Sequence, residues 1–321
     1  MYFSNKNNFF HGIMFHHFHD DKLHKKSQGS ISKDVLHKII KFLGRENILD
    51  AKDFLLKFKE NKLKEKDLCF TFDDGIKSQY DVAFPVLEDL KIKGFFFIYS
   101  SLLEAKPDLL EVYRYFRTNY FKDIDEFYES FFNKCNLNLD NYFKNNEKII
   151  KAKKIKYPFY SINDIKFRFI RDNLINKEKY EKIMLEMFTE KNFKEKKEFN
   201  NLFMNQKNLI NLKQSGHQIG LHSHSHHTNF KKLDYKTQYS EYEKNLNILA
   251  KNLNCSKNEI VSMSHPCGSY NDDSLKVLEK LGVELGFKNI MDVKENIDKS
   301  TNSKFEIARE DHANIIKLMN Q

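Results

Sequence analysis

The sequence predicts an α/β fold, an irregular (β/α)7 barrel that carries a large helical insertion. Short apolar runs rich in β-branched and aromatic residues alternate with segments of helical spacing near both ends of the chain. One strand, one helix and a second strand follow one another between residues 68 and 99, a succession that requires parallel pairing. Asp73 and Asp74 end the first of these strands, where parallel sheets bind their ligands.

Seven strands are expected, which favours a closed barrel over an open sheet. Each run lacks helical spacing and is bounded by glycine or by polar residues. The predicted strands are Gly12–Phe18, Leu68–Phe72, Phe95–Tyr99, His217–Leu221, Glu259–Ser264, Val283–Phe287 and Phe305–Ala308.

Helices are predicted between these strands. After the first strand, apolar residues at helical spacing extend from Val35 to Leu43, and Gly44 ends the helix. After the second strand, Val82, Val86 and Leu90 recur every four residues, and Pro85 predicts a kink. Near the end of the chain, Asn271, Asp272 and Asp273 suit a helix start, because helix N-termini favour negative charge.

Between residues 103 and 203 the strand signals stop, and Lys, Asn, Phe and Tyr dominate with helical spacing in places. This stretch is predicted to be a helical insertion within a single domain that spans residues 1–321. Loops at the ligand-binding edge of a barrel tolerate such growth. A lid, a substrate platform and a dimer contact remain open roles, so a homodimer is one expected assembly.

The composition indicates a soluble globular protein. The chain has 321 residues, 40% hydrophobic and 31% charged, which is typical of a soluble globular protein. The formal charge is +9, but acidic residues are interleaved with the basic ones, which favours a solvated mixed-charge surface. No nucleic-acid-binding module is recognisable, so nucleic acid is not an expected partner.

Cellular location is predicted from what the sequence lacks. The four cysteines, Cys69, Cys135, Cys255 and Cys267, are too widely spaced to suggest a disulfide framework or a zinc ribbon. The first residues carry no signal-peptide core, and no apolar run has the length of a membrane span. We therefore expect a cytoplasmic protein without a membrane span.

A metal site is predicted where histidines follow the fourth strand. His222 and His226 are four residues apart, so a helix or a tight loop there can direct both rings to one point. With Asp74 they supply two imidazoles and one carboxylate, the donor set of catalytic zinc and of several other divalent ions. His224 and His227 remain competing ligands.

Three motifs extend this site. They are Thr71–Gly75 (TFDDG), His222–His226 (HSHSH) and His265–Asn271 (HPCGSYN). With them the chain resembles the NodB-homology polysaccharide deacetylases, the carbohydrate esterase family four-like enzymes. These are metal-dependent hydrolases of N-acetylated or O-acetylated sugars, and their fold is an irregular barrel.

The resemblance implies a role for each motif residue. It implies that Asp73 is the general base and that Asp74, His222 and His226 bind the metal. It also implies that the third motif contacts the substrate through Cys267, Gly268 and Tyr270, with the backbone N–H of Cys267 holding the oxyanion. A divalent ion lowers the pKa of its bound water to about 7, so a neighbouring carboxylate can take the proton.

Three parts of the family pattern differ here, and one of them, a tryptophan-containing motif, is absent because the chain has no Trp. Ser264 stands where the family has an arginine that orients the base, and Arg309 near the last strand is expected to take over that charge. The late Leu-x-His motif, which supplies the general acid, has no clean match. Candidates for the acid are His17, His265 and His312, with His17 first because it lies at a predicted strand end.

The expected function is therefore metal-dependent hydrolysis that removes an acetyl or another acyl group from an N-acetylated sugar or a glycan precursor. Zinc is the first expected cofactor. The alternative is a catalytically silent protein that binds carbohydrate or acts as a scaffold while it retains the metal site. The presence of Asp73 favours the enzyme, because a binding site needs no base beside its ligands.

Overall fold

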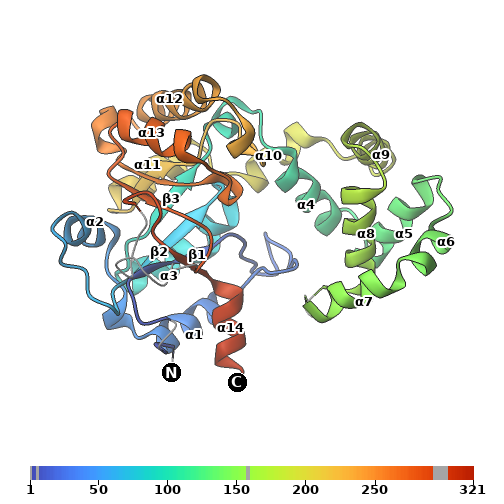
Figure 1. Cartoon of the computed structure of the whole chain (residues 1–321), viewed down its shortest axis with the longest axis horizontal. Coiled ribbons are helices and arrows are strands. Elements are labelled where there is room, and N and C mark those ends of the chain that lie inside the picture. Colours follow the sequence, from blue (N-terminus) through green and yellow to red (C-terminus); the bar gives the residue numbers. More distant parts are fainter. Residues whose placement is uncertain (1, 5–6, 157–159, 292–302) are drawn as a thin grey trace. The chain divides into compact units, whose positions relative to one another are not determined.

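Seven parallel strands form one sheet in the residues that the computed structural model describes, which are 2–4, 7–156, 160–291 and 303–321 (Figure 1). Their order in the sheet is β6-β5-β4-β3-β2-β1-β7, and every pair of neighbours is parallel. The strands are β1 (His11–Phe15), β2 (Leu68–Asp73), β3 (Phe95–Ile98), β4 (Gln218–Leu221), β5 (Ser262–Ser264), β6 (Leu285–Phe287) and β7 (Arg309–Asp311).

The two edges of this sheet meet through the segment that leads into β7. Ile307 pairs in parallel with Phe287 of β6, and its N–H donates to the Gly286 carbonyl at 3.0 Å. On its other side, the N–H of Gly12 donates to the Ala308 carbonyl at 2.9 Å. The sheet thus closes into an almost complete barrel, which confirms the predicted seven-stranded fold.

Side chains along β2 alternate between the outer face of the barrel and its interior. Phe70 and Phe72 face outward, where Phe72 stacks on Phe15 of β1 at 5.3 Å between ring centroids. Cys69 faces inward and belongs to the apolar cluster that fills one end of the barrel. Asp73 shares this inward face, four residues further along the strand, and it is only 2% exposed. The strand therefore places a carboxylate at the open end of an apolar interior.

Helices surround this barrel in the first of two compact units, residues 1–108 and 199–321 (Figure 1). They are α1 (Lys33–Leu43), α2 (Ala51–Lys59), α3 (Phe84–Asp89), α10 (Glu195–Leu202, which begins in the second unit), α11 (Gln206–Gln214), α12 (Tyr235–Asn252), α13 (Asp272–Lys280) and α14 (His312–Met319).

Local chemistry accounts for several helix ends. The Ser32 hydroxyl accepts from the Val35 N–H at the start of α1, and Gly44 ends this helix with a φ of 81°. Asn271 caps α13 in the same way, as predicted. Instead of one kinked helix after β2, a π-helical turn, Gln79–Ala83, precedes α3, and Pro85 lies in the first turn of α3.

The limits of three predicted strands differ from the structure by three or more residues. The first ends at Phe15 and not at Phe18, and the fifth begins only at Ser262, because residues 257–259 form a turn of 3-10 helix. The last strand lies at Arg309–Asp311 and not at Phe305–Ala308, although Ile307 already pairs with Phe287. Apolar character marked these segments correctly, but hydrogen bonding to the neighbours decides where pairing begins.

The second compact unit comprises residues 109–198 and is helical. Its interior is aromatic: Phe116, Phe127 and Phe131 are fully buried, and the Phe131 and Phe167 rings meet edge to face at 4.9 Å. A role as lid or dimer contact stays a prediction. The helices are α4 (Leu109–Asn119), α5 (Ile124–Lys134), α6 (Leu139–Asn145), α7 (Glu147–Lys156), α8 (Ile162–Asn173) and α9 (Lys177–Glu190).

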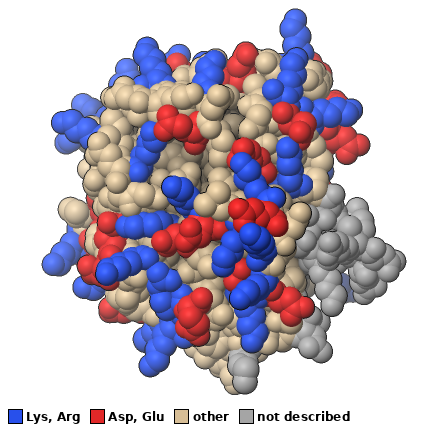
Figure 2. Space-filling model, turned by 90° about the vertical axis from the view of Figure 1, so that its left-hand side faces the viewer, with Lys and Arg blue, Asp and Glu red and all other residues tan. Residues whose placement is uncertain are grey.

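Charge on the molecular surface is mixed where it can be seen. On the face drawn in Figure 2, Lys and Arg side chains are interleaved with Asp and Glu side chains. This is the pattern that the sequence predicts for a solvated surface. None of the described helices is long and apolar enough to cross a membrane. The cytoplasmic location stays a prediction.

Candidate metal centre

Asp73 and Asp74 end β2 with different backbone conformations. Asp73 is the last residue of the strand, whereas Asp74 has a φ of 76°, in the left-handed region that side chains rarely adopt. Such strain persists only where the surrounding structure holds it, and it is concentrated at functional sites. The turn directs the two neighbouring carboxylates to different partners, so each can have a separate task.

His222 and His226 lie on the loop that follows β4. The sequence left open whether this segment is a helix or a tight loop, and the structure has a loop in which Ser223 and His226 have φ values of 59° and 54°. The Asn245 side chain of α12 fixes its start, accepting from the His222 N–H at 2.9 Å and donating to the Ile98 carbonyl at 3.0 Å. Both histidines are buried.

The side chains of Asp74, His222 and His226 converge, and their donor atoms all lie within 4.8 Å of one another. The Oδ1 atom of Asp74 lies 3.2 Å from Nε2 of His222 and 3.2 Å from Nε2 of His226. Ligands of one tetrahedral zinc ion, each about 2.0–2.1 Å from the metal, are about 3.3 Å apart. The spacing of these atoms therefore fits a common divalent ion.

Hydrogen bonds on the far side of each ring set the tautomers. Nδ1 of His222 donates to the Ser264 carbonyl at 2.8 Å, and Nδ1 of His226 donates to the Asp108 carboxylate at 2.8 Å. In the neutral ring each Nε2 is then the unprotonated nitrogen and presents a lone pair. Oδ1 of Asp74 is buried without a hydrogen-bond partner in the described residues. Three acceptors thus face one another, and a cation satisfies all three.

Electrostatics also favours positive charge at this centre. Burial opposes ionisation of Asp74, but the neighbouring His226 and His222 outweigh it and hold the pKa of this carboxyl well below its usual range. Burial likewise opposes protonation of His226, whereas the Asp74 charge and the Asp108 hydrogen bond raise its pKa well above the usual value. The cluster stabilises a positive charge between its members.

Asp73 is held by Arg309 from β7. The guanidinium donates from Nη1 to Oδ1 and from Nη2 to Oδ2, both at 2.8 Å, and Nη2 also donates to Oγ of Ser264 at 2.9 Å. Burial raises the pKa of Asp73, but the Arg309 charge and the hydrogen bonds outweigh it, so the pKa lies below the usual value. Arg309 from β7 therefore holds both oxygens of Asp73, and it also contacts Ser264, the residue that the resemblance aligns with the family's arginine.

His16 is the strand-end histidine closest to the carboxylates in the described contacts. Its Nε2 lies 3.9 Å from Oδ2 of Asp73 and 3.9 Å from Oδ2 of Asp74. His17, which the sequence favoured, is the next residue, and its ring stacks on that of His16 at 6.0 Å. The register explains the difference: Phe15 pairs with Phe72, which places His16 beside Asp73.

The other two histidines proposed as acids are buried in hydrogen bonds to backbone carbonyls. His265 donates from Nε2 to the Phe305 carbonyl at 3.0 Å, and burial lowers its pKa to about 3. Its ring stacks on Tyr270, whose hydroxyl donates to Glu306 at 2.7 Å. His312 lies within 3.2 Å of the Met14 carbonyl and 3.0 Å of the Gly29 carbonyl. Neither ring is placed to give a proton to a substrate at the metal centre.

Cys267 and Gly268 form a tight turn beside the metal centre. Cys267 is exposed, has a φ of 52°, and its Sγ lies 3.9 Å from Nε2 of His226. Gly268 has a φ of 64°, and a Cβ added there would lie 2.2 Å from the Asn289 side chain. The turn therefore requires glycine and brings the third motif to the metal ligands, as the resemblance implies.

The competing ligands take other positions. His224 forms a hydrogen bond through Nδ1 with the Ser100 hydroxyl at 2.9 Å, and its Nε2 lies 3.7 Å from a Glu104 oxygen. His227 is exposed, and its Nδ1 accepts from the Asn229 N–H at 3.1 Å. Neither belongs to the group of donor atoms around Asp74.

Sequence reasoning did not select His16 as the acid, although it noted the histidines at the end of the first strand, and it missed Asp108. His16 could have been found, because strand alternation places Gly12, Met14 and His16 on one face of β1. Asp108 gave no signal, since it belongs to no motif and its hydrogen bond to His226 spans 118 residues.

Comparisons with known proteins show the family and the fold. Residues 60–115 and 141–286 match the family model described as Polysaccharide deacetylase. The chain is similar in structure to Streptococcus pyogenes deacetylase PplD in complex with acetate, with a TM-score of 0.54, 15% identity, and coverage of 94% of this chain and 91% of that chain. It is also similar to a de-N-acetylase from Aggregatibacter actinomycetemcomitans, with a TM-score of 0.53, 13% identity, and coverage of 94% and 93%.

A third similar structure is IcaB from Ammonifex degensii, with a TM-score of 0.51, 12% identity, and coverage of 94% of this chain and 91% of that chain. At these identities the likeness shows the fold. No curated protein sequence matches the chain. The family match covers more than half of the chain and includes all three motifs.

Proposed function

Because the chain belongs to the polysaccharide deacetylase family, we propose that it hydrolyses the N-acetyl group of an amino sugar in a glycan or glycan precursor. One observation carries this proposal. The donor atoms of Asp74, His222 and His226 converge on one point where they can bind a metal ion. The adjacent Asp73 does not belong to this group and is oriented by Arg309, so it can act as the base.

A divalent ion fits the three ligands, and zinc is the first choice because two imidazoles and one carboxylate form the donor set of catalytic zinc. When bound, such an ion supplies Lewis acidity, which makes water a nucleophile near neutral pH and polarises a carbonyl group. Asp74, His222 and His226 hold it, and the Ser264 carbonyl and Asp108 keep the two rings oriented.

Asp73 acts as the general base in this proposal. Its low pKa keeps it ionised near neutral pH, so it can accept the proton of the attacking water. The bidentate contact with Arg309 orients the carboxylate and prevents it from turning toward the metal ligands. Arg309 is a positioning residue, because its guanidinium contacts the base and not the substrate.

His16 acts as the general acid. Its ring is 28% exposed and lies beside both carboxylates, so it can reach the nitrogen of a bound substrate. Protonation of that nitrogen lets the amine leave as the C–N bond breaks. The Cys267 backbone N–H, at the rim of the same centre, is proposed to donate to the oxyanion.

The alternative of a catalytically silent binding protein rested on two missing groups, the orienting arginine and the acid. Arg309 supplies the first function from another strand, and His16 is placed for the second. These positions support an active hydrolase over a binding protein.

Acetate release from N-acetylated amino sugars tests the proposal. We expect the zinc-loaded or cobalt-loaded chain to release acetate, and we expect Asp73→Asn and His16→Asn each to lower kcat about 100-fold or more while the metal stays bound. His17→Asn is the matched control and should keep most of the activity. No acetate from any N-acetylated sugar with the metal bound, or equal losses in His16→Asn and His17→Asn, would contradict the assignment.

A further inference from the structure

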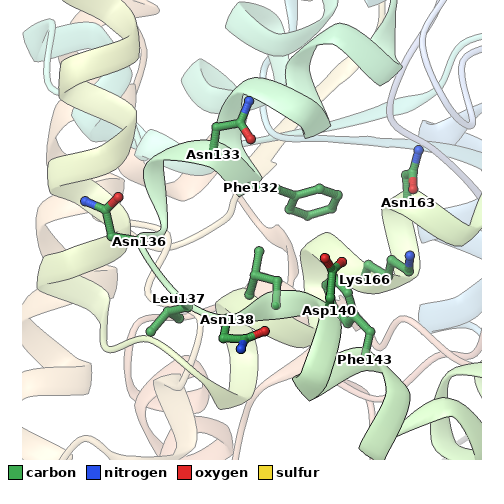
Figure 3. A pocket seen from close by; sticks show the side chains of 10 residues that line it. Phe132, Asn133, Asn136, Leu137, Asn138, Asp140, Phe143, Asn163 and Lys166 are labelled. Atoms are coloured by element: carbon green, nitrogen blue, oxygen red, sulfur yellow. The ribbon is translucent and has the colours of Figure 1, made fainter.

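A cavity of about 640 Å³ lies within the second unit, away from the metal ligands in the sequence (Figure 3). It is open to solvent on one side and is lined by the end of α5, the loop after it, α6 and one face of α8. Its volume is within the range of small-molecule binding sites, about 300–1,000 Å³.

The cavity combines one aromatic surface with polar groups from three helices. Figure 3 shows the Phe132 ring extending from α5 into the space between the labelled polar side chains. A second aromatic ring, Phe143 of α6, forms part of the wall, with Lys166 of α8 stacked over it at 4.7 Å. A ligand inside the cavity would therefore contact a flat apolar surface and a polar rim.

Much of the polar rim is available to a ligand. Within the described residues, the side chains of Asn133, Asn136 and Asp140 have no hydrogen-bond partner in the protein. Asn138 also lines the cavity, and its side-chain oxygen accepts from the Asn141 N–H, which leaves its amide N–H₂ group as a donor. Amides and a carboxylate offer both donors and acceptors at one site.

The charges of the lining residues narrow the class of ligand. Asp140 is the anion and Lys166 the cation of the lining, so the two charges balance. An anionic ligand such as a nucleotide would need several cations, and an apolar ligand would leave the amides unpaired. A neutral polyhydroxylated ring needs no excess of cations and leaves no amide unpaired. Its hydroxyl groups donate and accept hydrogen bonds at the ring edge, while its C–H face covers an aromatic ring.

We infer that this cavity binds a sugar residue of a neutral glycan, at a site separate from the metal centre. The choice of a carbohydrate over other neutral polyols rests on the proposed deacetylase function. The contacts of this sugar with the cavity make no use of the metal ligands.

Binding of N-acetylated chito-oligosaccharide to the full chain, measured by calorimetry, tests this inference. The variant Asp74→Ala with His226→Ala removes the metal centre, so binding that persists belongs to another site. We expect binding to persist there and to weaken about tenfold or more, which is about 1.4 kcal/mol, on adding either Phe132→Ala or the nearly isosteric Asp140→Asn. Tyr235→Ala, an exposed aromatic in the first unit, is the matched control.

Three binding results would overturn the inference. Oligosaccharide binding that Phe132→Ala and Asp140→Asn leave unchanged, or no binding at all to the metal-site variant, overturns it. Binding of ATP as tightly as the neutral oligosaccharide also overturns it. If the parent releases no acetate but still binds oligosaccharide through Phe132, the proposed function fails and the cavity assignment stands.

Discussion

Arg309 illustrates how a single residue can fill a role from an unexpected strand. Its guanidinium makes five hydrogen bonds, to Asp73, Ser264, Thr71 and the Lys288 carbonyl, and it is 1% exposed. A charge this deeply buried is tolerated only when it is paired and fully hydrogen-bonded. The sequence placed Arg309 just after the last predicted strand, whereas it is the first residue of β7, and only the barrel register shows that it meets Asp73.

Replacing Arg309 by lysine is expected to lower kcat about tenfold to 100-fold with little change in metal content. Lysine keeps the charge but cannot hold both oxygens of Asp73, so the base loses its orientation. Kinetics with a zinc-loaded enzyme, together with metal analysis, checks this. Arg45→Lys, outside the barrel interior, is the control. Loss of the metal instead of kcat would place Arg309 among the groups that support the ligands.

The other residues of the site also show what the sequence can and cannot predict. Asp73, Asp74, His222 and His226 are predictable because each lies in a short motif whose spacing has a chemical meaning. His16 required the alternation of a strand whose end the sequence misplaced. Side-chain identity shows which chemistry is available, whereas backbone register decides which of two adjacent histidines faces the carboxylates.

At the scale of elements, the loops that follow the strands carry the site. Among the non-glycine residues of these loops with left-handed backbone conformations are four at the candidate site, Asp74, Ser223, His226 and Cys267. Hydrophobic periodicity predicts strands and helices but contains no information on such conformations. For this reason the barrel was predictable, while the loop geometry that brings its ligands together was not.

The segment between β3 and α4 contributes Asp108, which accepts the hydrogen bond of His226 Nδ1. Asp108→Ala is expected to weaken zinc affinity about 10-fold to 100-fold, because the ring of His226 loses the partner that orients it. Competition with a chromophoric chelator measures this directly, without reference to activity. Asp123→Ala, a helix cap in the second unit, is the control. Unchanged zinc affinity in Asp108→Ala would show that the remaining packing orients the ring.

At the scale of the whole molecule, the family and the barrel were predictable from three motifs and from the strand–helix alternation. The family match confirms the predicted family, and the seven parallel strands confirm the fold. Contacts between distant segments, such as the pairing of Ile307 with Phe287, could not be predicted from local sequence patterns. They depend on the closure of the barrel.

Buried neutral histidines make the stability of this barrel depend on pH. Burial lowers the pKa of His11 and His217 to about 4 and that of His265 to about 3. The unfolded chain protonates these groups near pH 6.5, so it binds more protons than the folded chain below that pH. The free energy of unfolding should therefore fall by about 1.4 kcal/mol per pH unit for each such histidine as the pH drops toward the folded-state pKa.

Denaturant unfolding of the metal-free protein at about pH 6 and about pH 5 measures this slope. His265→Gln should reduce the pH dependence, since one group that takes up a proton on unfolding is removed. His227→Gln, at an exposed position, should leave it unchanged. An equal pH dependence in the parent and in His265→Gln would contradict the assignment of a neutral His265.

The metal content per chain tests the proposed metal centre most directly. We expect about one divalent ion in the parent after incubation with zinc, none in Asp74→Ala or His226→Ala, and about one in Asp73→Asn. His224→Ala, in the same loop but directed to Ser100, should also keep the ion. A parent that binds neither zinc, cobalt nor manganese, or an Asp74→Ala variant that retains the ion, would contradict a metal centre built from Asp74, His222 and His226.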